Sequence, residues 1–284
     1  LKSRKRVALH IGAHKTGSSS LQASLLGLDL PSHRYVSYAK DGNESGPFIS
    51  AFTDDPMRTR PDRYRGFSRD QIVRQRSNIL RYYDESLKSS NAHTFIFSGE
   101  AISKLPVSSL KQIKDFFEAR DCDIEIFIYM RPLQDVVPSI FQQVLTAPPS
   151  SWANNLKLYL FPRLVDLAQR FLPGYPAVAE NLLQVFPRSA IHFLPFTKAA
   201  FPQGDVVLDF VKRIDLQTYQ SSSAVRVNEA CSVLATKLLW LEGLSSSWTN
   251  KDVNFAVRRK MVDHLKSEFN SSSPGMVFGA TVMT

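Results

Sequence analysis

The chain has 284 residues, of which 43% are hydrophobic and 21% charged, so it can build a buried core and is not a disordered polypeptide. Lys and Arg outnumber Asp and Glu by 35 to 26, and the formal net charge of +9 favours anionic partners such as phosphorylated nucleotides, acidic glycans or nucleic acid. No apolar run approaches the roughly 20 residues that cross a bilayer. Two cysteines, Cys122 and Cys231, are too few for a disulfide framework or a metal site, which leaves buried thiols or one disulfide as alternatives.

The first predicted element is an apolar strand over residues 6–11, which runs through a tight turn into a helix. The turn and the start of the helix read Lys15, Thr16, Gly17, Ser18, Ser19 and Ser20. Amides at a helix start have no partner within the helix, and the helix dipole makes that end positive. Hydroxyls and an ammonium add to this site, and a glycine lets the backbone approach a ligand closely. The pattern therefore predicts a phosphate cradle.

Residues 31–66 are rich in Pro, Gly, Asp and Arg without a sustained period, which predicts a loop. Ser68 and Gln71 then form a capping-box pattern that starts a helix reaching Leu87. A second strand is predicted over residues 94–97.

Glu100 follows that second strand, directly after a glycine. Ligands of open α/β sheets collect outside the carboxyl ends of the strands, so Glu100 is expected near the first turn. A carboxylate there can act as a general base if partial burial raises its pKa. The alternative is that Glu100 is an acid that interacts with the dipole of the next helical segment.

A third strand is predicted over residues 124–130, and it ends in an Arg-Pro pair. Pro138 suits a first helical position, so residues 135–137 are expected to approach a helix that starts near Pro138 and carries Ser139 in its first turn. Arg131 and Ser139 would then face one crevice and suit a terminal phosphate. The alternatives are a surface arginine that caps the strand and an ordinary helix-start serine.

The remaining elements complete an alternation of strands and helices, which predicts an α/β fold with a mostly parallel central sheet in three α/β/α layers and helical insertions. We expect one domain over residues 1–284, with insertions at residues 31–93 and 145–185. His10 and His192 fall within strands and are expected to be packed, hydrogen-bonded side chains. The late elements are a strand over 190–195, a helix over 206–214 capped by Asp205, a helix capped by Asn228, a helix over 253–269 and a loose tail over 271–284.

The turn differs from a Walker A motif, in which the lysine directly follows the second glycine. Its Lys-Thr-Gly-Ser-Ser order resembles the 5′-phosphosulfate loop of sulfotransferases that use 3′-phosphoadenosine-5′-phosphosulfate (PAPS). The strand that ends in Arg131, together with Ser139, resembles the 3′-phosphate motif of the same family, closest to its bacterial and glycan-directed members. The resemblance covers residues 6–30 and 94–145, and it implies a P-loop-like fold with PAPS as the sulfuryl donor.

The resemblance also implies roles for the residues. Lys15 would stabilise the leaving phosphate, Glu100 would be the general base, and His14 is the alternative base. Thr16, Gly17 and the three serines would hold the 5′ end of PAPS, and Arg131 with Ser139 its 3′-phosphate. No metal is expected, because the third strand ends in Arg131 rather than in an aspartate that holds magnesium.

Transfer to a hydroxyl of a carbohydrate or related acceptor is the expected reaction. The two insertions, over residues 31–93 and 145–185, are expected on the acceptor side. They offer arginines and aromatic residues that suit a sugar or an anionic glycan: Arg58, Arg60, Arg63, Tyr64, Arg65, Tyr82, Tyr83 and Trp152. Two alternatives stay open, a P-loop ATP-dependent kinase or phosphotransferase and a catalytically silent nucleotide- or glycan-binding domain. Nucleic acid is not an expected partner, because the chain has no recognisable nucleic-acid-binding motif. We expect a bacterial cytoplasmic protein, or else the lumenal catalytic domain of a membrane-anchored enzyme.

Overall fold

The computed structural model describes residues 4–13, 15–55, 66–132, 134–136, 139 and 174–225. The chain forms two compact units, one made of Leu1–Arg131 with Gly174–Val227 and the other of Pro132–Pro173 with Asn228–Thr284. All the strands and helices given bounds below belong to the first unit. That residues 1–284 form a single domain stays a prediction.

The first unit is built on a sheet of five parallel strands in the order β2-β3-β1-β4-β5. The strands are β1 (Lys5–His10), β2 (His33–Tyr35), β3 (Thr94–Ser98), β4 (Cys122–Met130) and β5 (Ile191–Pro195). The central residues of β1, β3 and β4 are mostly apolar and buried, as is usual for a parallel sheet that helices cover on both faces. The predicted α/β class with a parallel sheet is confirmed.

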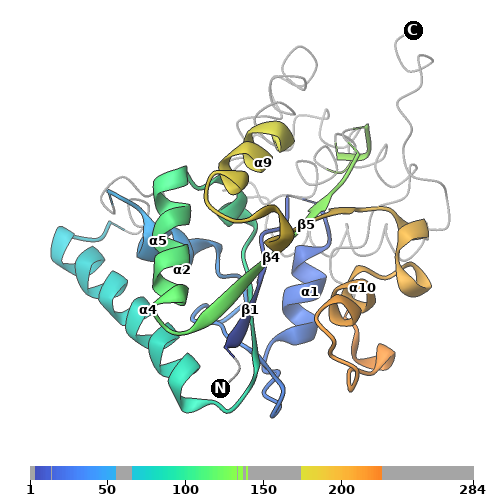
Figure 1. Ribbon diagram of the computed structural model, residues 1–284, viewed down its shortest axis with the longest axis horizontal. Helices are drawn as coiled ribbons and strands as arrows, with labels where there is room; N and C mark the ends of the chain where they lie inside the picture. Colours follow the sequence, from blue (N-terminus) through green and yellow to red (C-terminus); the bar gives the residue numbers. More distant parts are fainter. Residues whose placement is uncertain are drawn as a thin grey trace, which may run out of the picture. The chain divides into compact units, whose positions relative to one another are not determined.

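Helices cover both faces of this sheet (Figure 1). The α-helices are α1 (Ser18–Leu25), α2 (Ser45–Phe52), α4 (Arg69–Ser89), α5 (Val107–Glu118), α9 (Tyr175–Leu183) and α10 (Val206–Arg213). The short 3₁₀-helices span Glu100–Lys104, Arg188–Ala190, Lys198–Ala200, Pro202–Gly204 and Ser221–Ser223. Side chains alternate along a strand, so Val7 and Leu9 face α2, α4, α5 and α9, whereas Ala8 faces α1 and α10.

The prediction that residues 31–66 form only a loop is wrong in two places. β2 is a three-residue strand that pairs with β3, and α2 forms despite Gly46 and Pro47 near its start. Neither element has a strong local signal in the sequence. α2 exists because Phe48 and Phe52 are buried against the aromatic core, which outweighs its weak helix propensity.

The predicted caps of α4 and α10 are confirmed. The Ser68 hydroxyl accepts from the Gln71 amide, and the Gln71 side chain accepts from the Ser68 amide, which is a complete capping box. The Asp205 carboxylate accepts from the Val207 amide at 2.8 Å. The predicted cap at Asn228, the helix over 253–269 and the tail over 271–284 lie outside the described residues.

The segment after β4 becomes helical earlier than predicted. Residues 134–136 are already helical, and the amides of Asp135 and Val136 donate to the Pro132 carbonyl at 2.9 and 3.2 Å. Ser139 is helical, and its place in a first helical turn stays a prediction. The physical reason is that Pro132 itself occupies the start of the helix, where a proline fits without loss of a hydrogen bond.

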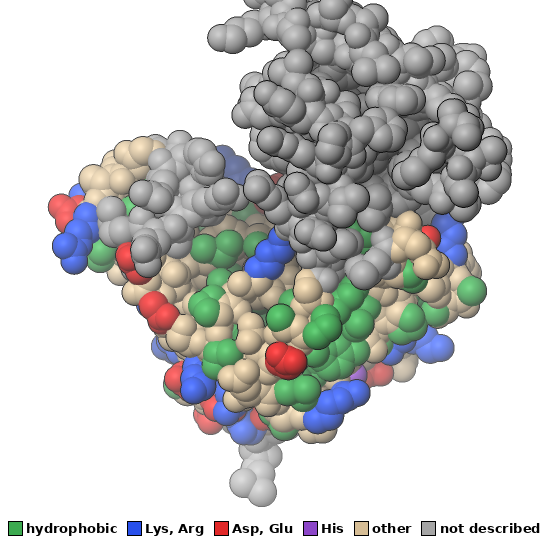
Figure 2. Space-filling view, turned by 90° about the horizontal axis from the view of Figure 1, so that it is seen from above, with side chains coloured by type: hydrophobic (Ala, Val, Ile, Leu, Met, Phe, Trp, Pro, Cys, Tyr) green, Lys and Arg blue, Asp and Glu red, His purple; other side chains and the backbone are tan. Residues whose placement is uncertain are grey.

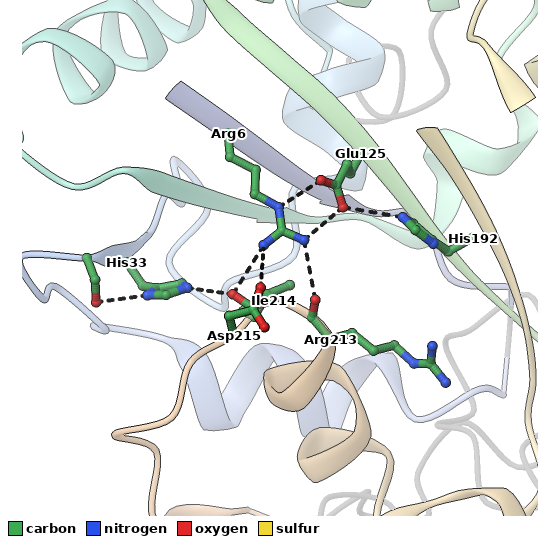
Figure 3. A network of polar contacts seen from close by, with 8 residues as sticks. Arg6, His33, Glu125, His192, Arg213, Ile214 and Asp215 are labelled. Atoms are coloured by element: carbon green, nitrogen blue, oxygen red, sulfur yellow. Dashed lines mark hydrogen bonds and ion pairs between the residues drawn. The ribbon is translucent and has the colours of Figure 1, made fainter. Parts of the chain in front are cut away.

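An ionic network joins the sheet to the end of α10 (Figure 3). The Arg6 guanidinium donates to both Glu125 carboxylate oxygens, at 3.0 and 2.8 Å, and to the Ile214 carbonyl at 3.3 Å. His192 lies 3.3 Å from the Glu125 carboxylate and stacks on Phe127, so the expectation of a packed, hydrogen-bonded histidine is confirmed there. These contacts anchor α10 across the sheet.

The described residues can be compared with three expectations from the sequence, on membrane spans, surface charge and cysteines. None of the described helices is long and apolar enough to cross a membrane. Figure 2 shows one face, on which basic and acidic side chains are intermixed instead of gathered into one positive stripe. Cys122 is a buried, free thiol, and Cys231 lies outside the described residues. Within the described ranges, no three His, Cys, Asp or Glu side chains gather closely enough to hold a metal ion.

Candidate functional site

The strand order places the ends of β1 and β4, which lead into the two predicted motifs, side by side. β1 lies between β3 and β4, and the chain leaves it through α1 toward β2 on the β3 side. The chain that leaves β4 returns as β5 on the opposite side. The order of the strands therefore reverses between β1 and β4, and open α/β sheets bind ligands at such a switch point. Lys15 follows β1 here, and Arg131 follows β4.

A direct contact joins these two motifs. Arg131 Nη1 donates to the Lys15 carbonyl at 2.9 Å. The Tyr175 hydroxyl accepts from the Arg131 amide at 2.8 Å and donates to the Arg131 carbonyl at 3.1 Å, which fixes the backbone at the end of β4. The guanidinium also lies 5.7 Å from the centre of the Phe196 ring. The sequence gives no signal for Tyr175 or Phe196, because both come from distant segments.

The backbone of the turn adopts a conformation that most residues avoid. Lys15 and Gly17 have φ angles of 68° and 75°. The left-handed region is unfavourable for a lysine, and such strain gathers at functional sites. A Cβ added at Gly17 would lie 2.7 Å from Val206 Cγ1, so only glycine fits. Thr16 Oγ1 donates to the Ala13 carbonyl at 2.6 Å, so this hydroxyl proton closes the turn.

The first turn of α1 carries the three predicted serines. Ser18 is buried, whereas Ser19 and Ser20 are half-buried. Gly17 has no side chain to cap the helix, and a helix start of this kind suits an anionic ligand. Ser18 Oγ is buried and has no hydrogen-bond partner among the described residues. A buried hydroxyl without a partner is costly, so this oxygen is a candidate contact for a ligand atom.

His10 lies beneath the same turn. Its Nδ1 is 2.8 Å from Ser98 Oγ, which also accepts from Gln22 Nε2 at 3.2 Å. Burial lowers the pKa of His10 to about 4, and the negative charge of Glu100 opposes that shift, so the ring is neutral at pH 7. The predicted packed histidine is confirmed on its Nδ1 side only, because Nε2 has no described partner.

Glu100 lies at the carboxyl end of β3, beside the end of β1. The Gly99 amide donates to the His10 carbonyl at 2.9 Å, and the Ala101 amide donates to Ser45 Oγ at 3.0 Å. Glu100 is half-buried and begins a 3₁₀-helix, so the helix-start interpretation also holds. Its charge raises the pKa of His10 and of Lys104 against the effect of burial, so the carboxylate acts electrostatically on the group beneath the turn.

Glu44 is a buried carboxylate that the sequence interpretation missed. It accepts from Ser37 Oγ at 2.8 Å, from the Ala39 amide at 2.9 Å and from the Tyr83 hydroxyl. Burial raises its pKa, and these hydrogen bonds oppose the shift. Tyr83 is wholly buried, because α4 turns its ring into the aromatic core. The expectation that this ring offers a stacking face to a sugar is therefore wrong.

Two predicted site residues stay untested by this geometry. His14, the alternative base, lies outside the described residues. Ser139 is half-buried but belongs to the second unit, whereas Arg131 and Lys15 belong to the first. The pairing of Ser139 with Arg131 on one phosphate stays a prediction.

Comparison with known proteins adds the following. No family model matches the chain, and no curated protein matches it. Among solved structures, it is similar to a sulfotransferase from Alicyclobacillus acidocaldarius, with 16% identity over 90% of this chain and 95% of that one, at a TM-score of 0.49. It is also similar to a sulfotransferase domain from the curacin biosynthetic pathway, with 11% identity over 96% of this chain and 100% of that one, at a TM-score of 0.43. Similarities this low do not decide an activity, which has to be argued from the site.

Proposed function

We propose that this protein is a sulfotransferase that moves a sulfuryl group from PAPS to a hydroxyl of a carbohydrate or related acceptor. The observation that supports this most is the 2.9 Å hydrogen bond from Arg131 to the Lys15 carbonyl. It joins two motifs that are 116 positions apart in the chain, at the reversal point of a parallel sheet. Both motifs resemble the donor-binding motifs of one enzyme family.

The residues of the turn fit a phosphosulfate group. The buried Ser18 hydroxyl has no hydrogen-bond partner in the part of the chain that the structure describes, and it lies at a helix start, where a bound anion is favoured. Gly17 fixes the shape of the turn, because a side chain in its left-handed conformation would meet Val206 and Phe196. Ser19 and Ser20 follow on the same turn. We assign Thr16 a supporting role, because its hydroxyl proton already closes the turn.

The proposed chemistry divides between two charged residues. PAPS supplies an activated sulfuryl group, and the transfer is an in-line displacement. The Lys15 ammonium neutralises the charge that grows on the leaving phosphate. Glu100 accepts the proton of the attacking hydroxyl. Arg131, whose backbone Tyr175 holds in place, binds the 3′-phosphate together with Ser139.

Calorimetric titration with 3′-phosphoadenosine-5′-phosphate (PAP) in EDTA tests the donor site directly. We expect micromolar binding that does not need a metal and exceeds the binding of ATP. Arg131→Ala should weaken PAP binding by about tenfold or more, because it removes a charge-assisted contact. Arg188→Ala is the matched control, because Arg188 is exposed and lies over Phe193, and it should leave PAP affinity unchanged.

Other outcomes of this titration would favour the alternatives. Preference for ATP with magnesium would overturn the proposal in favour of a P-loop kinase. PAP binding without any sulfate transfer to a panel of glycan and aryl acceptors would favour a silent binding domain. In that case Glu100→Gln would change neither PAP affinity nor any turnover.

A further inference from the structure

The guanidinium of Arg131 contacts the backbone of the Lys15 turn (residues 15–17), and binding of a 3′-phosphate does not explain this contact. Arg131 Nη1 donates to the Lys15 carbonyl at 2.9 Å. The same guanidinium lies 5.7 Å from the centre of the Phe196 ring, and a Cβ added at Gly17 would lie 3.4 Å from an atom of that ring. Arg131, Phe196 and the Lys15 turn therefore form one group of contacts at the carboxyl ends of β1, β4 and β5.

The Lys15 turn needs such a contact because its backbone is strained. Lys15 has a φ angle of 68°, a left-handed conformation that is unfavourable for a residue with a Cβ and persists only where the surrounding contacts determine it. The Thr16 hydroxyl closes the turn from within, by donating to the Ala13 carbonyl, whereas Arg131 holds the turn from the end of β4. A trans peptide points its carbonyl and its amide in opposite directions, so the bond to the Lys15 carbonyl also sets the direction of the Thr16 amide.

The backbone of Arg131 is itself held in place. The Tyr175 hydroxyl accepts from the Arg131 amide at 2.8 Å and donates to the Arg131 carbonyl at 3.1 Å. Tyr175 begins α9, 44 positions further along the chain. Next to Arg131, the Met130 carbonyl accepts from the Phe196 amide at 2.8 Å. The end of β4 is therefore fixed both by α9 and by the segment after β5, which gives the Arg131 side chain a rigid base.

We infer that Arg131 is a positioning residue for the 5′ end of the donor, in addition to its contact with the 3′-phosphate: its bond to the Lys15 carbonyl keeps the turn in the conformation that holds the 5′-phosphate. Tyr175 acts one step further away, by fixing the backbone of Arg131. The inference rests on the proposed function, because it takes the 5′ end of the donor to bind at the Lys15 turn. A nucleotide without a 3′-phosphate should therefore also lose affinity when Arg131 is replaced.

The affinities for PAP and for adenosine 5′-phosphate (AMP), which has no 3′-phosphate, separate the two roles of Arg131. Calorimetry in EDTA measures PAP directly and AMP by displacement of PAP. Arg131→Ala should weaken AMP binding about tenfold, because the turn loses a hydrogen bond from a charged group. It should weaken PAP binding by a larger factor, because the contact with the 3′-phosphate is lost as well.

Arg188→Ala is the matched control for Arg131→Ala. Arg188 Nη1 also donates to a backbone carbonyl, that of Ile191 at 2.7 Å, and its guanidinium also lies over a phenylalanine ring, 5.5 Å from the centre of Phe193. Arg188 precedes β5 and so lies at the opposite edge of the sheet from the Lys15 turn. Its replacement should leave both affinities unchanged.

Tyr175→Phe tests the second step without a change of charge. It removes the hydroxyl that contacts the Arg131 backbone and should weaken AMP and PAP binding about fivefold. Combined with Arg131→Ala, it should cause no further loss, because Tyr175 acts through the Arg131 side chain. Tyr82→Phe is the matched control, since the Tyr82 hydroxyl donates to the Ser37 carbonyl at 2.8 Å, and it should change neither affinity.

The possible failures are distinguishable. An Arg131→Ala protein that binds AMP as wild type does, or a wild-type protein that binds PAP but no AMP, would overturn the inference while the proposed function stands. Additive losses in the double variant would overturn the part of the inference that concerns Tyr175. A wild-type protein that does not bind PAP would overturn both the inference and the proposed function. If Arg131→Ala does not fold, Tyr175→Phe decides, since an unchanged AMP affinity would overturn the inference and the expected loss would support it.

Discussion

Two buried titratable side chains lie near the carboxyl ends of β1 and β3, and they differ in how completely their polar atoms are paired. Glu44 accepts from a hydroxyl, an amide and the Tyr83 phenol. His10 has a partner on one nitrogen and none described on the other. Both groups are held by the same element, since the Glu44 amide donates to the Ser98 carbonyl and the Ser98 side chain meets His10.

The contrast between Glu44 and His10 distinguishes side chains that stabilise the fold from side chains that lie at a ligand site. A buried polar group with all its partners inside the protein fixes the fold, and its loss is a loss of stability. A buried polar group that lacks a partner lowers stability and is kept where a ligand completes it. We therefore expect changes around Glu44 to alter unfolding and changes around the Lys15 turn to alter binding and turnover.

The largest expected effect is on turnover at Glu100. Glu100→Gln should lower the rate of sulfate transfer by about 100- to 10,000-fold, the usual contribution of a general base, and leave PAP affinity within twofold. Steady-state transfer assays and calorimetry measure the two quantities. The exposed Glu118→Gln is the control and should transfer sulfate at the wild-type rate. Normal turnover of Glu100→Gln would make His14 the first candidate for the base.

The next effect is on turnover at Lys15. Lys15→Ala should lower transfer by about 100- to 1,000-fold, because one preorganised positive contact to the leaving group is lost. Its thermal unfolding midpoint should stay within a few degrees of wild type, in line with a role on the binding side of the contrast. Lys198→Ala, an exposed control in a short 3₁₀-helix, should change neither quantity. A large loss of stability in Lys15→Ala would break the contrast.

The third prediction concerns His10 and the pH dependence of the protein's stability. Its pKa in the folded protein is lowered from 6.5 to about 4, so the unfolded chain binds the proton first as the pH falls. The contribution of neutral His10 to the free energy of unfolding is fully present above pH 6.5, and it falls by about 3 kcal/mol as the pH falls to 4. Urea unfolding at several pH values should show this slope in wild type and a shallower one in His10→Asn. Equal slopes would mean that folding does not lower the pKa of His10.

The smallest effect is expected at Glu44, with the opposite slope. Its pKa is raised in the folded protein, so its contribution to stability is present at low pH and is lost as the pH rises above 4.5. Glu44→Gln keeps the acceptor for Ser37 and removes the charge, so its stability relative to wild type should rise with pH. Glu44→Ala leaves the Tyr83 hydroxyl without its partner and should cost about 1–3 kcal/mol. PAP affinity should stay unchanged in both variants, and a tenfold change in either would place Glu44 in the donor site.

The sequence by itself determined the features that depend on neighbours a few residues apart. Four strands, the capping box at Ser68, the cap at Asp205 and the turn at Lys15 follow from periodicity and turn chemistry, and all are found where they were expected. The placement of Arg131 next to that turn follows from the rule that parallel strands share a carboxyl edge.

Only the tertiary structure decided which side chains are paired. β2 and α2 are short and form through packing, and residues 134–136 are already helical, although the local signal for a helix start lies at Pro138. The Tyr83–Glu44 bond joins residues 39 positions apart, and the Tyr175–Arg131 bond joins residues 44 apart. Local sequence carries no information on such pairs, because burial depends on the whole sheet and its helices. For the same reason, only the structure could show that Glu44 is satisfied and that His10 is not.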